Sequence, residues 1–241
     1  MDKVGAFSFN VDSDLVDFRR RITIPVVGAQ LLHAATIHAA SRGFGYNDMQ
    51  RRGAAWVLSR LAVEMSATPE LSEDITIYTW IESAAGMFTH RCFELTSATR
   101  GVFGYARSIW AAISLETRRP TPLDTEGLGV YYLDRPCPIA KPGKIPPVEN
   151  LVAGEPYRVR YSDLDINGHL NSIRYMEHLL DRFDLDLFAQ KDISRFEIAY
   201  MAEGRYGMDL TIHCREPLED AWHMAVCHEG KAICRAAVTW Q

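Results

Sequence analysis

The chain has 241 residues, of which 47% are hydrophobic, and this suits either one large globular domain or two small ones. Its 26 lysines and arginines against 31 aspartates and glutamates give a formal net charge of -5, which argues against nucleic acid as the main partner. Five cysteines without a C-x-x-C pair predict neither a disulfide framework nor a zinc site, and they favour reduced thiols in the cytoplasm. There is no recognisable leader and no stretch near the ~20 apolar residues that span a bilayer, so we expect a soluble protein without membrane insertion.

The first half predicts one buried helix among strands. Residues 7–11 alternate apolar and polar side chains, and residues 18–25 are typical of a strand that ends at a proline. The apolar pattern over residues 27–41 predicts a well-buried helix, with Gly43 as its stop. Four further strands are expected, over residues 56–65, 75–82, 88–98 and 102–115.

Seven prolines between residues 117 and 150 predict a linker on the surface. After it the same order recurs, with a helix from about residue 169 to 183 between a strand at 157–161 and strands near 196–202, 208–213, 222–228 and 233–240. We therefore expect an α+β fold of two tandem units, each an antiparallel sheet wrapped around a central helix. The expected boundaries are 1–125 for the first domain, 126–150 for the linker and 151–241 for the second domain.

The two halves show a weak internal repeat. Aligning Gly28 with Gly168 superposes the two predicted helices. In this alignment, three polar residues of the second half correspond to three apolar residues of the first: Asp165, Asn167 and His169 to Pro25, Val27 and Ala29. The first half is therefore predicted to bind substrate without contributing chemistry.

Asp165, Asn167 and His169 place three potential catalytic side chains within five residues. An extended conformation would direct all three to one side, where the second helix is expected to begin. A helix N-terminus offers unpaired N–H donors and partial positive charge, which suits a developing oxyanion. An aspartate or asparagine at such a position is equally typical of a turn or a helix cap, so the spacing alone leaves both interpretations open.

The chain carries three segments whose order and spacing match a known family over nearly its whole length: residues 56–65 (WVLSRLAVEM), 116–119 (ETRR) and 162–171 (SDLDINGHLN). In these segments it resembles the acyl-acyl carrier protein (ACP) thioesterases of plant plastids and bacteria. The resemblance implies two tandem hotdog domains, with the acyl-chain cavity in the first and the catalytic site in the second. It also implies hydrolysis of acyl-ACP to free fatty acid and carrier protein in fatty acid biosynthesis, without a cofactor.

In that family the Asp-x-Asn-x-His residues act with a glutamate, often followed by a cysteine, on a strand after the catalytic helix. Here Glu203 matches the glutamate, whereas Gly204 stands where plant members carry the cysteine. A Cys–His nucleophile would need the thiol at that position, and Cys214, Cys227 and Cys234 lie at unmatched positions. We therefore favour direct attack by water.

Each residue of the expected site can be given a role in that attack. Glu203, together with Asp165, would orient and deprotonate the water, and His169 would assist proton transfer. Asn167 would position the water or polarise the thioester carbonyl. Backbone N–H groups near Gly168 and His169 would act as oxyanion donors.

The expected macromolecular partner is acyl carrier protein, which is strongly acidic. Arg174, one helical turn beyond His169, is the candidate contact for it, although an ordinary surface charge would look the same. The remaining histidines have no metal-like spacing, so no metal site is expected. Exposed sheet edges leave a homodimer open.

Three other functions fit parts of the pattern. An acyl-CoA or aryl-CoA thioesterase is the closest alternative, because hotdog folds host both activities and the fold does not decide the substrate. A hydroxyacyl dehydratase would not need the asparagine and glutamate. A non-catalytic acyl-binding module would not need the four polar residues at all.

Overall fold

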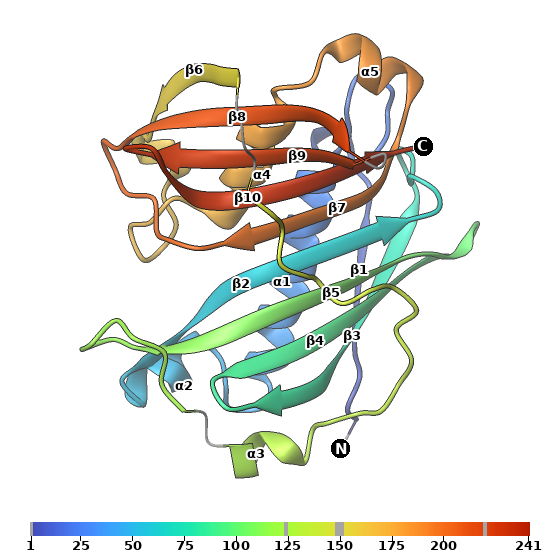
Figure 1. The fold of residues 1–241 in the computed structure, drawn as a ribbon. Coiled ribbons are helices and arrows are strands. Elements are labelled where there is room, and N and C mark those ends of the chain that lie inside the picture. The colour runs from blue at the N-terminus through green and yellow to red at the C-terminus, as the bar shows by residue number, and fades with distance from the viewer. Residues whose placement is uncertain (1, 123–124, 148–151, 219–220) are drawn as a thin grey trace. The chain divides into compact units, whose positions relative to one another are not determined.

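The computed structural model describes residues 2–122, 125–147, 152–218 and 221–241. The chain divides into two compact units, and each contains its own antiparallel strands (Figure 1). Unit 1 consists of Met1–Thr23 and Val27–Pro142, and unit 2 consists of Ile24–Val26 and Gly143–Gln241.

Unit 1 is built on an antiparallel sheet whose described strands follow the order β1-β3-β4-β5-β2. The strands are β1 (Gly5–Asn10), β2 (Ala54–Met65), β3 (Asp74–Ala85), β4 (Phe88–Ser97) and β5 (Gly101–Ser114). The helical segments are η1 (Ser13–Leu15), α1 (Ile24–Ala40), whose first three residues belong to unit 2, α2 (Tyr46–Arg51) and α3 (Thr125–Gly129). Trp80 on β3 and Phe93 on β4 are fully buried and form part of the core. The five strands expected at these places are confirmed.

The helix α1 packs on this sheet through an apolar surface. Val27, Leu31 and Ala34 recur at helical spacing and are buried. Near the end of α1, His38 Nδ1 lies 2.9 Å from Arg91 Nη1 on β4. This confirms the predicted helix, which begins three residues earlier than expected.

The strand predicted over residues 18–25 is wrong. Asp17 begins a turn in which its backbone N–H donates to the Arg21 carbonyl at 2.8 Å, and α1 already begins at Ile24. The isoleucines and the proline that suggested a strand therefore belong to the end of a turn and the first helical turn, where proline is well tolerated.

Unit 2 repeats the architecture, with its strands in the order β7-β10-β9-β8-β6. They are β6 (Val152–Arg158), β7 (Ile193–Tyr200), β8 (Asp209–Leu218), β9 (Ala221–His228) and β10 (Lys231–Trp240). Its helical segments are η2 (Tyr161–Asp163), α4 (Ser172–Leu180) and α5 (Leu185–Gln190). Each unit thus has the expected α+β arrangement of an antiparallel sheet and a central helix.

The central helix α4 is shorter than expected and begins later. Asn171 caps it, because its side-chain oxygen accepts the Ile173 N–H at 2.8 Å. Tyr175, Met176 and Leu179 are buried on one face. The predicted start at residue 169 is wrong by three residues, since the residues before Asn171 form a loop.

The proline-rich segment packs against the sheet of unit 1. Cys137 and Ile139 pack against Trp80 and Cys92, and Arg107 Nη2 donates to the Cys137 carbonyl at 2.7 Å. The segment thus lies along the sheet and buries several apolar side chains. Residues 123–124 and 148–150 of this stretch lie outside the described residues.

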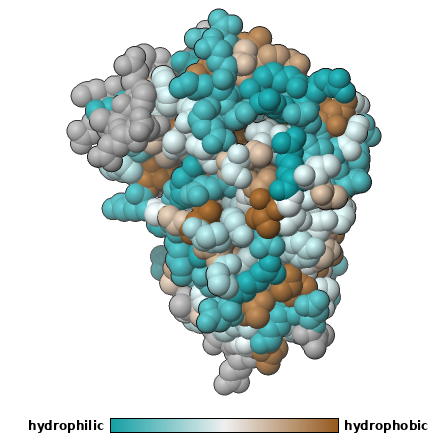
Figure 2. All heavy atoms as spheres, turned by 90° about the vertical axis from the view of Figure 1, so that its right-hand side faces the viewer, coloured by the Kyte–Doolittle hydropathy of each residue, from teal (hydrophilic) through white to brown (hydrophobic). Residues whose placement is uncertain are grey.

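No helix in the described part of the chain is long and apolar enough to cross a membrane. On the face shown in Figure 2, hydrophobic residues form small groups separated by hydrophilic ones.

Candidate active site

The three residues of the Asp-x-Asn-x-His motif lie in the loop that joins η2 to α4. Asp165 shapes this loop: its Oδ1 accepts the N–H of Asn167 at 2.8 Å and the N–H of His169 at 3.0 Å. Its own N–H donates to the His169 carbonyl at 2.7 Å. Gly168 adopts a positive φ of 75°, which glycine tolerates best. The expected extended conformation is therefore wrong, and the loop is a compact turn.

Glu203 is brought to this loop by backbone pairing. The Leu170 N–H donates to the Gly204 carbonyl at 2.8 Å, and His169 forms an antiparallel bridge with Arg205. As a result, His169 Nε2 lies 3.2 Å from Glu203 Oε2. The side chains of His169 and Glu203 retain 21% and 31% of their exposure, so water can reach both.

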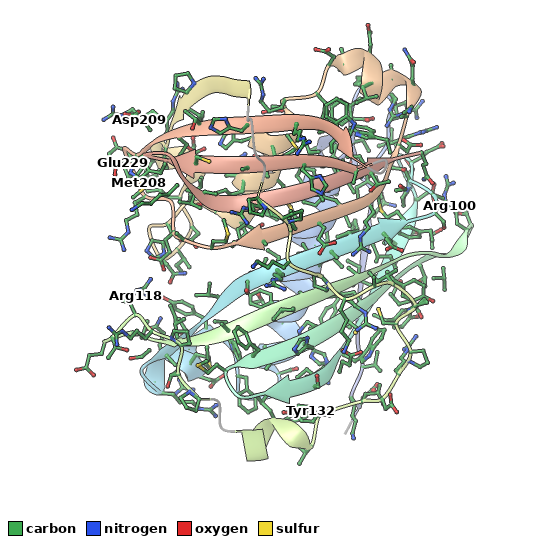
Figure 3. The ribbon with its side chains drawn as sticks, viewed as in Figure 1. Arg100, Arg118, Tyr132, Met208, Asp209 and Glu229 are labelled. Carbon is green, nitrogen blue, oxygen red and sulfur yellow. The ribbon has the colours of Figure 1, made fainter. Side chains whose placement is uncertain are left out.

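Arg205 is a member of this cluster that sequence analysis missed. Its Nη2 lies 3.3 Å from Glu203 Oε2, the oxygen that also faces His169. The signal in the sequence is the two-residue spacing after Glu203, because alternate residues of an extended segment share a side. Figure 3 shows the end of the unit 2 sheet that adjoins this segment, marked by Met208, whose Sδ accepts the Arg205 N–H at 3.3 Å.

Asn167 differs from its neighbours because its side chain is exposed and has no hydrogen-bond partner among the described residues. Its amide can therefore donate to an incoming carbonyl or to a water molecule. The structure thus brings His169 and Glu203 into contact and places Asn167 and Asp165 in the same turn, where Asp165 Oδ1 already accepts two backbone N–H groups.

The expected oxyanion donors at Gly168 and His169 are not available. The Gly168 N–H donates to the Asp165 carbonyl at 3.0 Å, and the His169 N–H donates to Asp165 Oδ1. The reason is the later start of α4, which leaves these amides inside the turn instead of in the first helical turn. The side-chain amide of Asn167 is the donor that the motif still offers.

Gly204 is closely packed. A Cβ built there would lie 2.7 Å from Tyr175 Oη and 2.9 Å from Leu170 Cβ, both too short for real contacts. The Gly204 N–H also donates to Tyr175 Oη at 2.9 Å. This backbone therefore has no room for a cysteine at this position, where the family resemblance led us to expect one.

The other cysteines of unit 2 are unsuited to act as nucleophiles. Burial raises the pKa of Cys214, Cys227 and Cys234 above that of an ordinary thiol. A thiol must lose its proton to attack a carbonyl, so these side chains favour the inactive form.

Arg174 lies on the first turns of α4, as expected. Its Nη1 donates to Glu177 Oε2 at 2.5 Å, and its side chain is 42% exposed. Its charge is therefore already paired within the helix, as in many surface ion pairs.

The turn in unit 2 has a duplicate in unit 1. Asp17 Oδ1 accepts the N–H groups of Arg19 at 2.8 Å and Arg21 at 3.1 Å, as Asp165 does with the residues two and four positions later. The bridge between Val16 and Ile22 matches the bridge between Leu164 and Leu170. These pairs fix the register of the repeat, in which Asp17 aligns with Asp165.

The predicted alignment of Gly28 with Gly168 is therefore wrong, and so is the match to Pro25, Val27 and Ala29. In the correct register, Asp165, Asn167 and His169 are equivalent to Asp17, Arg19 and Arg21. Glu203 is equivalent to Thr68, because the Ile22 N–H donates to the Pro69 carbonyl as the Leu170 N–H does to the Gly204 carbonyl. Unit 1 thus retains the turn and its aspartate but lacks the asparagine, histidine and glutamate. The residues that fit the chemistry occur together in unit 2.

The two histidines of α1 differ in burial, because His33 is exposed. His38 is fully buried, and burial together with Arg91 and Arg42 lowers its pKa to about 3. The described residues contain no group of three histidine, cysteine or acidic side chains that could hold a metal ion.

Comparison with known proteins gives a consistent family. The family model for the acyl-ACP thioesterase N-terminal domain matches residues 3–131, and the model for its C-terminal domain matches residues 150–241. A crystal structure of an acyl-ACP thioesterase from Bacteroides thetaiotaomicron is 41% identical, with a TM-score of 0.94 over 99% of this chain and 98% of that one. The two-hotdog fold is confirmed by this likeness.

Plant relatives are more distant. The 12:0-ACP thioesterase from Umbellularia californica is 22% identical and shares the fold, with a TM-score of 0.89 over 100% of this chain and 98% of that one. An oleoyl-acyl carrier protein thioesterase of Arabidopsis thaliana is 26% identical over 81% of this chain and 58% of its own length. The chain spans about half the length of the curated relatives it matches, between 44% and 61% for two from Cuphea.

Proposed function

The chain belongs to the acyl-ACP thioesterase family, and from this we propose that it hydrolyses acyl-ACP to a free fatty acid and carrier protein in fatty acid biosynthesis. The observation that carries the proposal is the 3.2 Å contact of His169 Nε2 with Glu203 Oε2, beside the exposed amide of Asn167. A carboxylate, an imidazole and an amide are sufficient to hydrolyse a thioester, because its carbonyl is already activated and its thiolate leaves readily.

In the proposed reaction, Glu203 accepts a proton from a water molecule whose oxygen attacks the thioester carbonyl carbon. Asn167 donates a hydrogen bond to the oxygen that becomes negative. The tetrahedral intermediate then collapses, the C–S bond breaks, and the thiolate of the carrier's arm takes a proton that returns from Glu203 through His169. The products are the carboxylic acid and the free thiol, so no cofactor or metal takes part.

Asp165 holds the loop in this proposal and does not act as the base. Its Oδ1 already accepts two backbone N–H groups, and Asp17 makes the same two bonds in a turn without the other site residues. Arg205 supports Glu203 by binding the oxygen that faces His169. The sequence-based role of Asp165 as a second base is thus replaced by a positioning role.

The carrier protein is the proposed partner, and unit 1 is the proposed binding site for its acyl chain. Arg174 remains a candidate contact for the carrier protein, although its pairing with Glu177 reduces the charge that it can offer. We also propose that the first domain covers residues 1–125, the linker 126–150 and the second domain 151–241. Five free cysteines are consistent with a cytoplasmic location, which we propose as well. The edge strands of the sheet are the proposed contact surface of a homodimer.

The decisive test compares Glu203→Gln with the wild type on matched acyl-ACP and acyl-CoA substrates. We expect the substitution to lower kcat by about 100-fold or more, because it removes the base while keeping the side-chain shape. Glu177→Gln, on the surface of α4, serves as the matched control and should leave kcat with a small thioester unchanged. Full activity of Glu203→Gln would contradict this site, whereas faster turnover of acyl-CoA than of acyl-ACP would identify a CoA thioesterase.

A further inference from the structure

A buried carboxylate lies beneath the loop that carries the proposed active site. Asp163 is 4% exposed, and its Oδ2 accepts hydrogen bonds from the Tyr157 hydroxyl and, at 2.6 Å, from the Arg160 N–H. Its backbone carbonyl accepts the N–H of Asn171, the cap of α4, at 2.8 Å. Asp163 therefore joins the end of β6, the start of η2 and the start of α4, which are the fixed points on both sides of the loop.

Two aromatic rings complete this cluster. The Tyr157 ring lies 3.9 Å from the His178 ring on α4, measured between centroids, and His178 Nε2 is 3.9 Å from Asp163 Oδ1. Burial and the hydrogen bond to Asp163 raise the pKa of Tyr157 to about 12, and burial lowers the pKa of His178. At neutral pH the tyrosine therefore keeps its proton and remains a hydrogen-bond donor to the carboxylate.

The duplicate turn of unit 1 shows what the fold requires at these positions. When Asp17 is aligned with Asp165, Tyr157 and Asp163 correspond to Phe9 and Leu15, and the strand register agrees, since Phe9 pairs with Ile75 as Tyr157 pairs with Leu210. The unit 1 turn repeats several backbone hydrogen bonds of the unit 2 turn with apolar side chains at these positions: the Asp17 N–H donates to the Arg21 carbonyl and the Leu15 N–H to the Asp12 carbonyl, as Asp165 does to His169 and Asp163 to Arg160. A buried carboxylate is costly to desolvate. The fold does not need it, and it occurs under the turn that carries Asn167 and His169.

We infer that Asp163 and Tyr157 are positioning residues for thioester hydrolysis: together they fix both ends of the loop so that Asn167 and His169 meet the substrate in reactive geometry. The inference rests on the proposed function of the same site. Its physical basis is the sensitivity of such reactions to position, since a displacement of ~1 Å can cost about 100-fold in rate. Neither residue touches the reacting atoms.

The test replaces Tyr157 and Asp163 with the residue types that unit 1 has at the equivalent positions, the phenylalanine of Phe9 and the leucine of Leu15. The double variant Tyr157→Phe/Asp163→Leu removes the carboxylate and its donor but keeps a filled interior, so we expect its Tm to stay within a few degrees of the wild type. We expect kcat to fall by about 10- to 100-fold, with KM changed less than about threefold. The fall should be the same with acyl-ACP and with a small acyl thioester, because the loop and not docking is affected.

Ser162→Ala is the matched control, because Ser162 is exposed on the same short turn. It should retain full kcat. A folded double variant with wild-type kcat would overturn the inference. If the double variant loses stability, Tyr157→Phe decides, since it removes one hydroxyl: we expect at least a threefold lower kcat, and an unchanged kcat would overturn the inference. Inactivity of the wild type would instead contradict the proposed function.

Discussion

Aspartates 163 and 165 are two residues apart and serve the loop in different ways. Asp165 lies at the tip and accepts two backbone N–H groups, whereas Asp163 is buried at the base and accepts the Tyr157 hydroxyl. Asp165 Oδ1 and Asp163 Oδ2 therefore already accept hydrogen bonds from groups of the protein. The group that combines contact with His169 and exposure to water is Glu203. Glu203 is therefore better suited to act as the general base than Asp165, the aspartate of the motif.

Gly204 provides a residue-scale prediction. Gly204→Cys should lower the free energy of unfolding by about 1–3 kcal/mol, because its Cβ would come too close to Tyr175 Oη and Leu170 Cβ. We also expect lower turnover, since Gly204 pairs with Leu170 directly beside His169. Urea titration and steady-state kinetics measure the two effects.

Gly204→Ala separates the size of the side chain from the chemistry of the thiol. It introduces the same Cβ without sulfur, so we expect it to show a similar loss of stability and activity. A Gly204→Cys variant that is more active than both Gly204→Ala and the wild type, and that is inactivated by iodoacetamide, would contradict water as the nucleophile.

At the scale of elements, the sequence predicted regular structure well and turns poorly. The strands β2 to β5 follow alternating apolar patterns, which depend on the local chain and on one buried face. The start of α4 was misplaced because the apolar pattern continues through Leu170, although Asn171 is the cap. Turn residues such as Asp165 and Arg20 are held by specific hydrogen bonds that hydrophobic patterns do not reveal.

Glu73 shows how one such turn is held, and it gives a pH-dependent prediction. It precedes β3 and binds Arg100, in the turn between β4 and β5, with Oε1 to Nη2 at 2.6 Å. This hydrogen bond is the main cause that lowers the pKa of Glu73 to about 2 from its usual 4.5. Because the folded-state pKa is depressed, the stabilisation is present above pH 4.5 and is lost as the pH falls towards about 2.

Glu73→Gln should therefore lower the free energy of unfolding at pH 7 by about 1–2 kcal/mol, after allowance for solvent screening. The difference from the wild type should shrink as the pH falls through this range. Glu70→Gln is the control: it lies 3.6 Å from Arg100 with a 56% exposed side chain, so we expect a change below about 0.5 kcal/mol. Equal losses for both variants would contradict the assignment of the stabilisation to Glu73.

At the scale of the whole molecule, the two units share backbone geometry but differ in chemistry. The repeat was visible in the sequence, yet its register was not, because the side chains of the two turns have diverged while their hydrogen bonds are to the backbone. The spacing of Asp165, Asn167 and His169 marked them as candidates but left a turn or cap role open, and the family motif added Glu203. The contact of His169 with Glu203 depends on the pairing of distant segments and could not be read from spacing.

The duplicate turns allow a matched comparison of the same substitution in both units. Asp17→Ala and Asp165→Ala each remove an acceptor for two backbone N–H groups, so each should lower the free energy of unfolding by about 1–3 kcal/mol. Only Asp165→Ala should lower kcat, by about 100-fold, because its turn carries Asn167 and His169.

The comparison is made by urea titration of both variants and by kinetics with a small acyl thioester. Asp17→Ala should retain kcat within about twofold of the wild type, because its turn carries arginines at the two catalytic positions. An equal loss of kcat in both variants would mean that the unit 1 turn also takes part in the reaction. A loss of stability in only one of the two variants would contradict the equivalence of the two turns, whereas a somewhat larger loss for Asp17→Ala is expected because Asp17 Oδ2 also lies 3.3 Å from Arg19 Nε. Loss of kcat in Asp165→Ala alone would show that Asp17 and Asp165 both stabilise their turns but that only Asp165 affects catalysis. The reason is that the reacting side chains occur beside this aspartate only in unit 2.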